Sequence, residues 1–93
     1  MQFLVRMDVH IPHDLDTETV SDLRARETAR AAEIQRAGKW PELWRVVGQV
    51  ANISVFDVDT HEELHELLTS LPLFPYMRID VTALTRHPSK VDR

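Results

Sequence analysis

A glutamate on the apolar side of a predicted helix is the residue in this chain whose position best suits chemistry. At about 100° per residue, Val20, Leu23, Ala31 and Ile34 form a stripe about 80° wide, and Glu27 falls in its middle. A carboxylate that faces a sheet is costly unless it is paired, hydrated or protonated. Burial of this kind raises a carboxyl pKa, which turns a weak base into a useful one near neutral pH.

The same pattern has a simpler interpretation. The helix could be shifted in register, or Glu27 could belong to a surface ladder of charges with Arg24 and Arg30, each about one turn away. Either arginine could also pair with a buried Glu27. The two interpretations differ in where they place the carboxylate, against the sheet or in solvent.

A second pattern, "HEELH" at residues 61–65, matches the H-E-x-x-H zinc-protease motif. His61 directly follows the predicted helix cap, no third ligand is evident, and a chain of 93 residues has no room for a protease cleft. We therefore expect no metal site and interpret the segment as a solvated first turn whose acids suit the helix dipole. His65 flanks the leucine stripe of this helix and could face a pocket or solvent.

Several other side chains have both a structural and a functional interpretation. Trp40 is typical of a core or an interface but could form the wall of a ligand site. Arg45 and Arg78 are ordinary strand charges, or either could hold an anion, since guanidinium matches carboxylate geometry. Asn52 fits a turn, and Tyr76 is either an interface ring or a hydroxyl donor.

Composition limits the class of protein. The chain has 93 residues, a formal net charge of −4 and no cysteine. This length predicts a single domain, the acidic balance argues against nucleic acid, and the lack of cysteine fits a reducing compartment such as the cytoplasm. No segment has the roughly 20 apolar residues of a membrane span, so we expect no membrane partner.

Hydrophobic periodicity predicts the elements that must position these residues. Residues 2–11 alternate as a strand, a helix runs from a cap at Asp16 or Thr17 to about Ala37, and Thr60 caps a second helix. We expect two strands at 44–51 and 52–58 with a reversal near Ala51–Asn52, a last strand from Met77, and a polar arm at about 85–93. The order βαββαβ predicts an α+β, ferredoxin-like fold, with a four-stranded antiparallel sheet and two helices on one face.

The connector "LPLFPYM", residues 71–77, has two prolines and no charged residue. The prolines are expected to stop the second helix and stiffen the path into the last strand. Phe74 and Tyr76 would then be held outward, as suits a subunit contact or the rim of a pocket.

Several strings together resemble the muconolactone Δ-isomerase family over nearly the whole chain: "FLVRMDV", "GKWPELWRVVG", "ANISVFDV", "LHELL", "LPLFPYM" and "RHPS". The resemblance implies a cofactor-free shift of a ring double bond that converts muconolactone to 3-oxoadipate enol-lactone. That reaction belongs to the catechol branch of the β-ketoadipate pathway. The resemblance also implies a ring-shaped assembly of ten chains with pockets completed by neighbouring subunits.

On this basis we assign Glu27 as the base, because it is the one carboxylate on an otherwise apolar helix face. Arg24 would hold the substrate carboxylate or tune Glu27, and Trp40 would form an apolar wall. Three further residues are candidate donors to the dienolate oxygen: Asn52, His65 and Tyr76.

Two alternatives stay open from the residues. The related chloromuconolactone dehalogenase shares the scaffold and much of this pattern. A non-catalytic binding or assembly module could also use the fold, since it hosts many functions, but it would need no carboxylate on the buried stripe.

Overall fold

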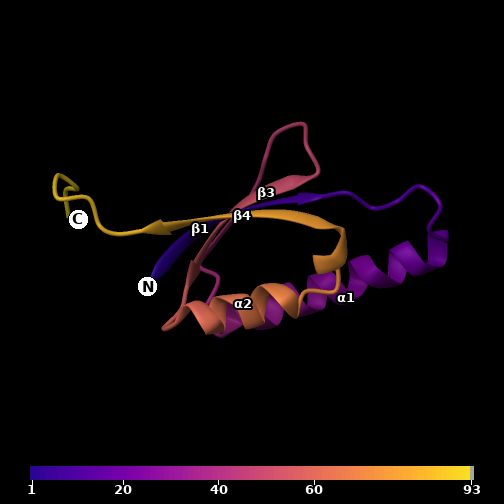
Figure 1. The fold of residues 1–93 in the computed structure, drawn as a ribbon, viewed down its shortest axis with the longest axis horizontal. Coiled ribbons are helices and arrows are strands. Elements are labelled where there is room, and N and C mark those ends of the chain that lie inside the picture. Colours follow the sequence, from indigo (N-terminus) through magenta and orange to yellow (C-terminus); the bar gives the residue numbers. More distant parts are fainter. Residues whose placement is uncertain (93) are drawn as a thin grey trace.

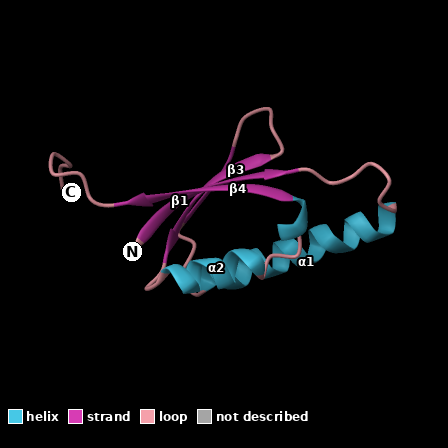
Figure 2. Ribbon diagram, in the orientation of Figure 1, coloured by secondary structure: helices cyan, strands magenta, loops and turns pink. Residues whose placement is uncertain are grey.

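The computed structural model describes residues 1–92 and has four antiparallel strands and two α-helices. The strands are β1 (Gln2–Val9), β2 (Glu42–Arg45), β3 (Ala51–Asp57) and β4 (Met77–Leu84), in the sheet order β2-β3-β1-β4. The helices α1 (Thr17–Arg36) and α2 (His61–Thr69) both lie on one face of the sheet (Figures 1 and 2). The predicted ferredoxin-like α+β fold is confirmed. No helix in residues 1–92 has the length and apolar character needed to cross a membrane.

The period-two pattern of β1 decides which side of the sheet is buried. Phe3, Val5 and Met7 face the helices and are almost fully buried, at 4%, 0% and 0% exposed. Their partners on β4 are Ala83, Val81 and Ile79, which lie on the same face because directly opposed residues in antiparallel strands point the same way. The core continues into β3, both helices and the adjoining loops, through Ile34, Trp40, Phe56, Val58, Leu64, Leu68 and Leu71.

Local hydrogen bonds determine where the helices begin and end. The carboxylate of Asp16 accepts from the Thr19 N–H at 3.3 Å and caps α1, and the Thr60 hydroxyl accepts from the Glu63 N–H at 3.0 Å and caps α2. Gly38 follows the end of α1 with φ at +78°, the left-handed conformation that glycine adopts without steric cost. The predicted caps of both helices and the predicted end of the first helix are therefore confirmed.

The prediction for the second strand and for the reversal was wrong, whereas the third strand agrees to within one residue at each end. We expected strands at 44–51 and 52–58, but β2 covers only Glu42–Arg45 and residues 46–50 form the reversal. The valines of this segment favour a strand, whereas Gly48, with φ at +78°, supplies the left-handed residue that the turn needs. Asn52 consequently lies within β3 and not at a turn.

The connector between α2 and β4 packs inward more than the sequence predicted. α2 ends at Thr69, and residues Phe74–Tyr76 form a single 3₁₀ turn before β4. Leu71 and Leu73 are buried at 2% and 5% exposed, and Phe74, which we expected to be held outward, packs partly against the core. Beyond β4, residues 85–92 of the predicted polar arm have no helix or strand, and Arg93 lies outside the described residues.

Candidate active site

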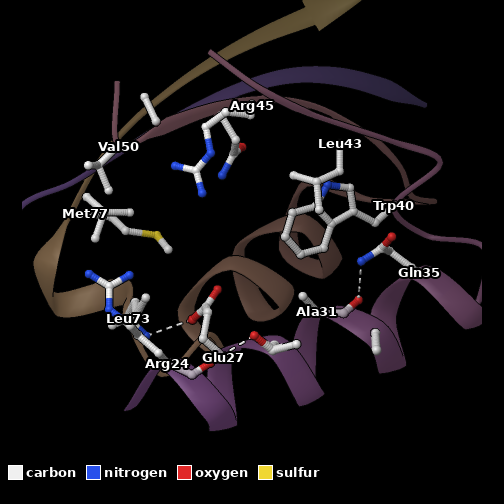
Figure 3. Close-up of a pocket in the computed structure, with 15 residues that line it drawn as sticks. Arg24, Glu27, Ala31, Gln35, Trp40, Leu43, Arg45, Val50, Leu73 and Met77 are labelled. Carbon is white, nitrogen blue, oxygen red and sulfur yellow. Dashed lines mark hydrogen bonds between the residues drawn. The ribbon is translucent and has the colours of Figure 1, made fainter. Parts of the chain in front are cut away.

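An open cavity of about 460 Å³ lies between α1 and the sheet. Its walls come from α1, from the β2–β3 hairpin, from the end of β1 and from the connector before β4. Figure 3 shows Glu27 pointing from α1 into the space between two ends of the cavity. Arg24, Arg45 and Met77 lie toward one end, and Trp40 and Leu43 form the other (Figure 3).

The Glu27 side chain is partly buried and is held by the backbone of the connector. The Leu73 N–H donates to Glu27 Oε1 at 2.9 Å, across 46 residues of sequence. Glu27 Oε2 has no hydrogen-bond partner among residues 1–92. This oxygen is not fully buried. One oxygen is thus anchored while the other stays accessible from the cavity, which is the arrangement a proton-transfer base needs.

The surroundings of Glu27 favour the neutral form of its carboxyl group more than water does. Burial raises the pKa of the Glu27 carboxyl group, and the hydrogen bond from the Leu73 N–H, which stabilises the charged form, opposes this only in part. Within the described part of the chain, neither Arg24 nor Arg30 forms an ion pair with Glu27; Arg30 instead donates to Ser70 and lies 3.8 Å from Glu33.

Two arginines from opposite walls line the cavity. Arg24 lies one turn before Glu27 on α1, and Arg45 lies at the end of β2, paired in register with Asn52 of β3. Arg45 makes one long hydrogen bond of 3.4 Å from Nη1 to the Gln49 carbonyl, so most of its guanidinium donors stay available for a ligand. Arg78, the other arginine considered from sequence, is opposite Asp8 on the far face of the sheet and does not line the cavity.

Asn52 belongs to the sheet wall of the cavity. Its register partner on β1 is Met7, a helix-facing residue, so the amide of Asn52 lies on the same face of the sheet. Asn52 Oδ1 accepts a hydrogen bond of 2.7 Å from the Ser54 hydroxyl. Its Nδ2 has no protein acceptor among residues 1–92 and remains a free donor.

Trp40 forms an apolar end of the cavity. It is 3% exposed and stacks on Phe56, with ring centroids 4.6 Å apart and planes inclined by 26°. The indole Nε1 is buried without a hydrogen-bond partner in the described residues. With Leu43 and Met77, Trp40 gives the cavity walls that are poor in polar groups, as small-molecule sites usually are.

His65 and Tyr76 do not line this cavity. His65 is exposed on α2, and Tyr76 is partly buried in the 3₁₀ turn, where its carbonyl accepts from the His10 N–H at 2.7 Å. Across residues 1–92 no group of three or more His, Cys, Asp or Glu side chains is arranged to hold a metal ion.

One contributor to the site was not identified from sequence, and another was not distinguished from a second candidate. The Leu73 N–H is a backbone donor, and no side-chain pattern reveals which way a backbone amide points. The sequence offered two arginines, Arg45 and Arg78, as possible anion-binding residues. A strand placed at 44–51 gave no reason to prefer Arg45. The signal that separates them is the true hairpin register, in which Arg45 faces the helices.

Replacing Glu27 with glutamine should stabilise the protein in a pH-dependent way. Because the folded-state pKa of Glu27 is raised, the folded protein binds this proton more tightly, so its stability falls as pH rises from the unfolded-state pKa through the folded-state pKa. Glu27→Gln removes that loss and can still accept from the Leu73 N–H. We expect urea unfolding to show the variant more stable than wild type at pH 7 and the difference to shrink toward pH 4.

An exposed glutamate provides the matched control. Glu66→Gln, on the exposed side of α2, should show no comparable gain at pH 7. A Glu27→Gln variant with wild-type stability at every pH would contradict the view that burial disfavours the Glu27 charge.

Known proteins identify the family of this chain. The family described as Muconolactone delta-isomerase matches residues 1–90. Muconolactone Delta-isomerase of Cupriavidus pinatubonensis is 56% identical over 98% of this chain and 99% of its own length, and that of Rhodococcus opacus is 57% identical over 96% of each. A crystal structure of muconolactone isomerase, 48% identical, matches with a TM-score of 0.94 over 100% of this chain and 97% of its own. The resemblance seen in the sequence is confirmed, and the chain belongs to the muconolactone delta-isomerase family.

Proposed function

We propose that this protein is a muconolactone Δ-isomerase that uses Glu27 as its acid–base group. The observation that carries the proposal is the half-buried Glu27 carboxylate in the wall of the cavity, with Oε1 anchored by the Leu73 N–H and Oε2 free. Membership of the family supports the substrate, a small lactone carboxylate, and its place in catechol catabolism through the β-ketoadipate pathway. A non-catalytic module on this fold would have no use for a carboxylate in this position.

The proposed reaction is a proton transfer between two carbons of one ring. Glu27 Oε2 takes the proton from the γ-carbon, which carries the carboxymethyl arm, and the C–H electrons move through the ring to the lactone carbonyl. The intermediate is a dienolate with its negative charge on that oxygen. Glu27 then returns the proton to the α-carbon, so the double bond moves from the α,β to the β,γ position and the carboxylate is regenerated. Atoms and electrons balance within substrate and protein, so the proposed mechanism uses no cofactor.

The remaining cavity residues supply the charges that this reaction needs. Arg24 and Arg45 are cations at one end of the cavity, where they suit the carboxylate of the substrate arm. Asn52 is the neutral donor closest in register to Arg45 and suits the dienolate oxygen. Trp40 and Leu43 form the apolar end, which limits water near the reacting carbons. His65 and Tyr76 were also candidate donors, but neither lines this cavity. We propose that they act only if assembly brings them to the pocket of another copy.

We also propose that the protein is a homo-oligomer, and its resemblance to the family implies a decamer. We further propose that it functions in the reducing cytoplasm. The β2–β3 hairpin exposes large apolar side chains, with Trp44 63%, Val50 55% and Val47 94% exposed. A domain of this size gains stability by covering such residues. Contact between hairpins of neighbouring copies would also bring subunits close to the mouth of the cavity, because Val50 lines it.

The first test is the turnover of Glu27→Gln on muconolactone, followed by ultraviolet absorbance. Glutamine keeps the shape and the Leu73 contact but cannot accept the proton, so we expect the rate to fall by about 10²- to 10⁴-fold. Glu66→Gln should keep wild-type turnover. Wild-type turnover in Glu27→Gln would remove Glu27 from the chemistry, and chloride release from 5-chloromuconolactone in preference to isomerisation would identify a dehalogenase.

The second test compares two arginines on opposite faces of the sheet. Arg45→Met should raise KM for muconolactone about 10- to 100-fold with a smaller change in kcat, because a charge-assisted hydrogen bond to the substrate carboxylate is lost. Arg78→Met, outside the cavity, should leave KM unchanged. Equal KM values for the two variants would exclude Arg45 from substrate binding.

The third test concerns assembly and uses sedimentation velocity across a range of protein concentrations. Val47→Asp places a charge on the exposed hairpin and should shift the protein toward smaller species. Ser21→Asp, on the exposed side of α1, serves as the control for an added charge. If Val47→Asp sediments as wild type does at the lowest concentration, the hairpin is not the contact between copies.

A further inference from the structure

Ser54 is a buried polar side chain with a single partner. It is 0% exposed, and no other serine, threonine, amide or charged residue within residues 1–92 is buried. Its hydroxyl donates to Asn52 Oδ1 at 2.7 Å. Both residues lie on β3 two positions apart, so their side chains project from the same face of the strand.

The neighbours of Ser54 leave its hydroxyl proton little choice of acceptor. The residues opposite it are Val5 on β1 and Leu43 on β2, which have no polar side-chain atoms. A buried hydroxyl that makes no hydrogen bond loses its hydration without compensation. Asn52 Oδ1 is the acceptor that prevents this loss.

This requirement also selects one orientation of the Asn52 amide. If the amide were rotated by 180°, Nδ2 would face Ser54 and the hydroxyl could accept from it, but the hydroxyl proton would then have no partner in the core. The observed orientation satisfies the hydroxyl and leaves Nδ2 as the atom available to the cavity that Asn52 lines.

We propose that Ser54 is a positioning residue for the isomerisation: its buried hydroxyl orients the Asn52 amide so that Nδ2 donates to the dienolate oxygen. The inference rests on the proposed isomerase function and adds a residue that does not itself line the cavity. An amide free to rotate would present Oδ1, an acceptor, to the same oxygen for part of the time, and an acceptor repels the charge that develops there. A donor whose direction is set in advance is worth more in a partly dry site than one that must reorient.

A double-mutant cycle tests this role through kinetics. Ser54→Ala should lower kcat about 10-fold with little change in KM, and Asn52→Ala should lower kcat about 10²-fold. Because Ser54 acts through Asn52, Ser54→Ala should cause no further loss in the Asn52→Ala background. Ser54→Thr, which keeps a hydroxyl, should recover most of the activity, and Ser21→Ala, on the exposed side of α1, should match wild type.

The outcomes separate this inference from the proposed function. If the losses from Ser54→Ala and Asn52→Ala multiplied in the double variant, the role of Ser54 would be overturned while the isomerase proposal stood. Full activity in Ser54→Ala would have the same consequence. A wild-type protein that fails to isomerise muconolactone would overturn both.

A measurement that needs no turnover provides a second test of whether Ser54 orients the Asn52 amide. Nitrogen-15 relaxation of the Asn52 side-chain NH₂, identified by its absence in Asn52→Ala, should report a rigid amide in wild type and a more mobile one in Ser54→Ala. Other side-chain amides, such as that of Gln35 on α1, should be unaffected by the change. An equally rigid Asn52 amide in both proteins would overturn the inference even if Ser54→Ala were slow.

Discussion

The hydrogen bond from the Leu73 N–H to Glu27 joins the two parts of the molecule that the site requires. It forms in the connector after α2, which ends at Thr69. The Leu71 and Phe74 amides make local backbone hydrogen bonds, whereas the Leu73 amide donates to Glu27 on α1. Leu73 itself is buried, which holds its backbone against α1. An apolar, proline-rich stretch thereby places one backbone donor against a carboxylate 46 residues away. That contact keeps Glu27 in place while burial keeps its charge costly.

The cavity divides its chemical tasks between two walls. The helix wall carries Glu27, the proposed acid–base group, and Arg24. The sheet wall carries donors from adjacent strands, Arg45 and Asn52. A helix packed on a sheet suits this division, because each wall is rigid and the space between them is otherwise apolar. The core supports the sheet wall directly, since the buried Ser54 hydroxyl contacts Asn52. A single hydrogen bond therefore links the buried core to a residue that lines the cavity.

Periodicity and capping made most of the fold predictable. The alternation of β1, the caps at Asp16 and Thr60 and the start of β4 at Met77 all agree with the structure. The hairpin failed because β-branched residues favour a strand by propensity, whereas the turn depends on one glycine in a left-handed conformation. That error moved Asn52 to a turn and hid the difference between Arg45 and Arg78, which is a difference of sheet face and hence of register.

By itself the sequence determined the family, the βαββαβ order and the unusual glutamate, because these follow from local periodicity and from motifs that span the chain. It could place Glu27 on an apolar stripe but could not say what would meet it there. Only the tertiary structure decided that the partner is a backbone amide and not Arg24 or Arg30. It also decided that His65 and Tyr76 do not line the cavity and that the Ser54 hydroxyl donates to Asn52. The physical reason is that these contacts depend on strand register, loop path and backbone direction, which arise when distant segments pack together and leave no local pattern in the residues.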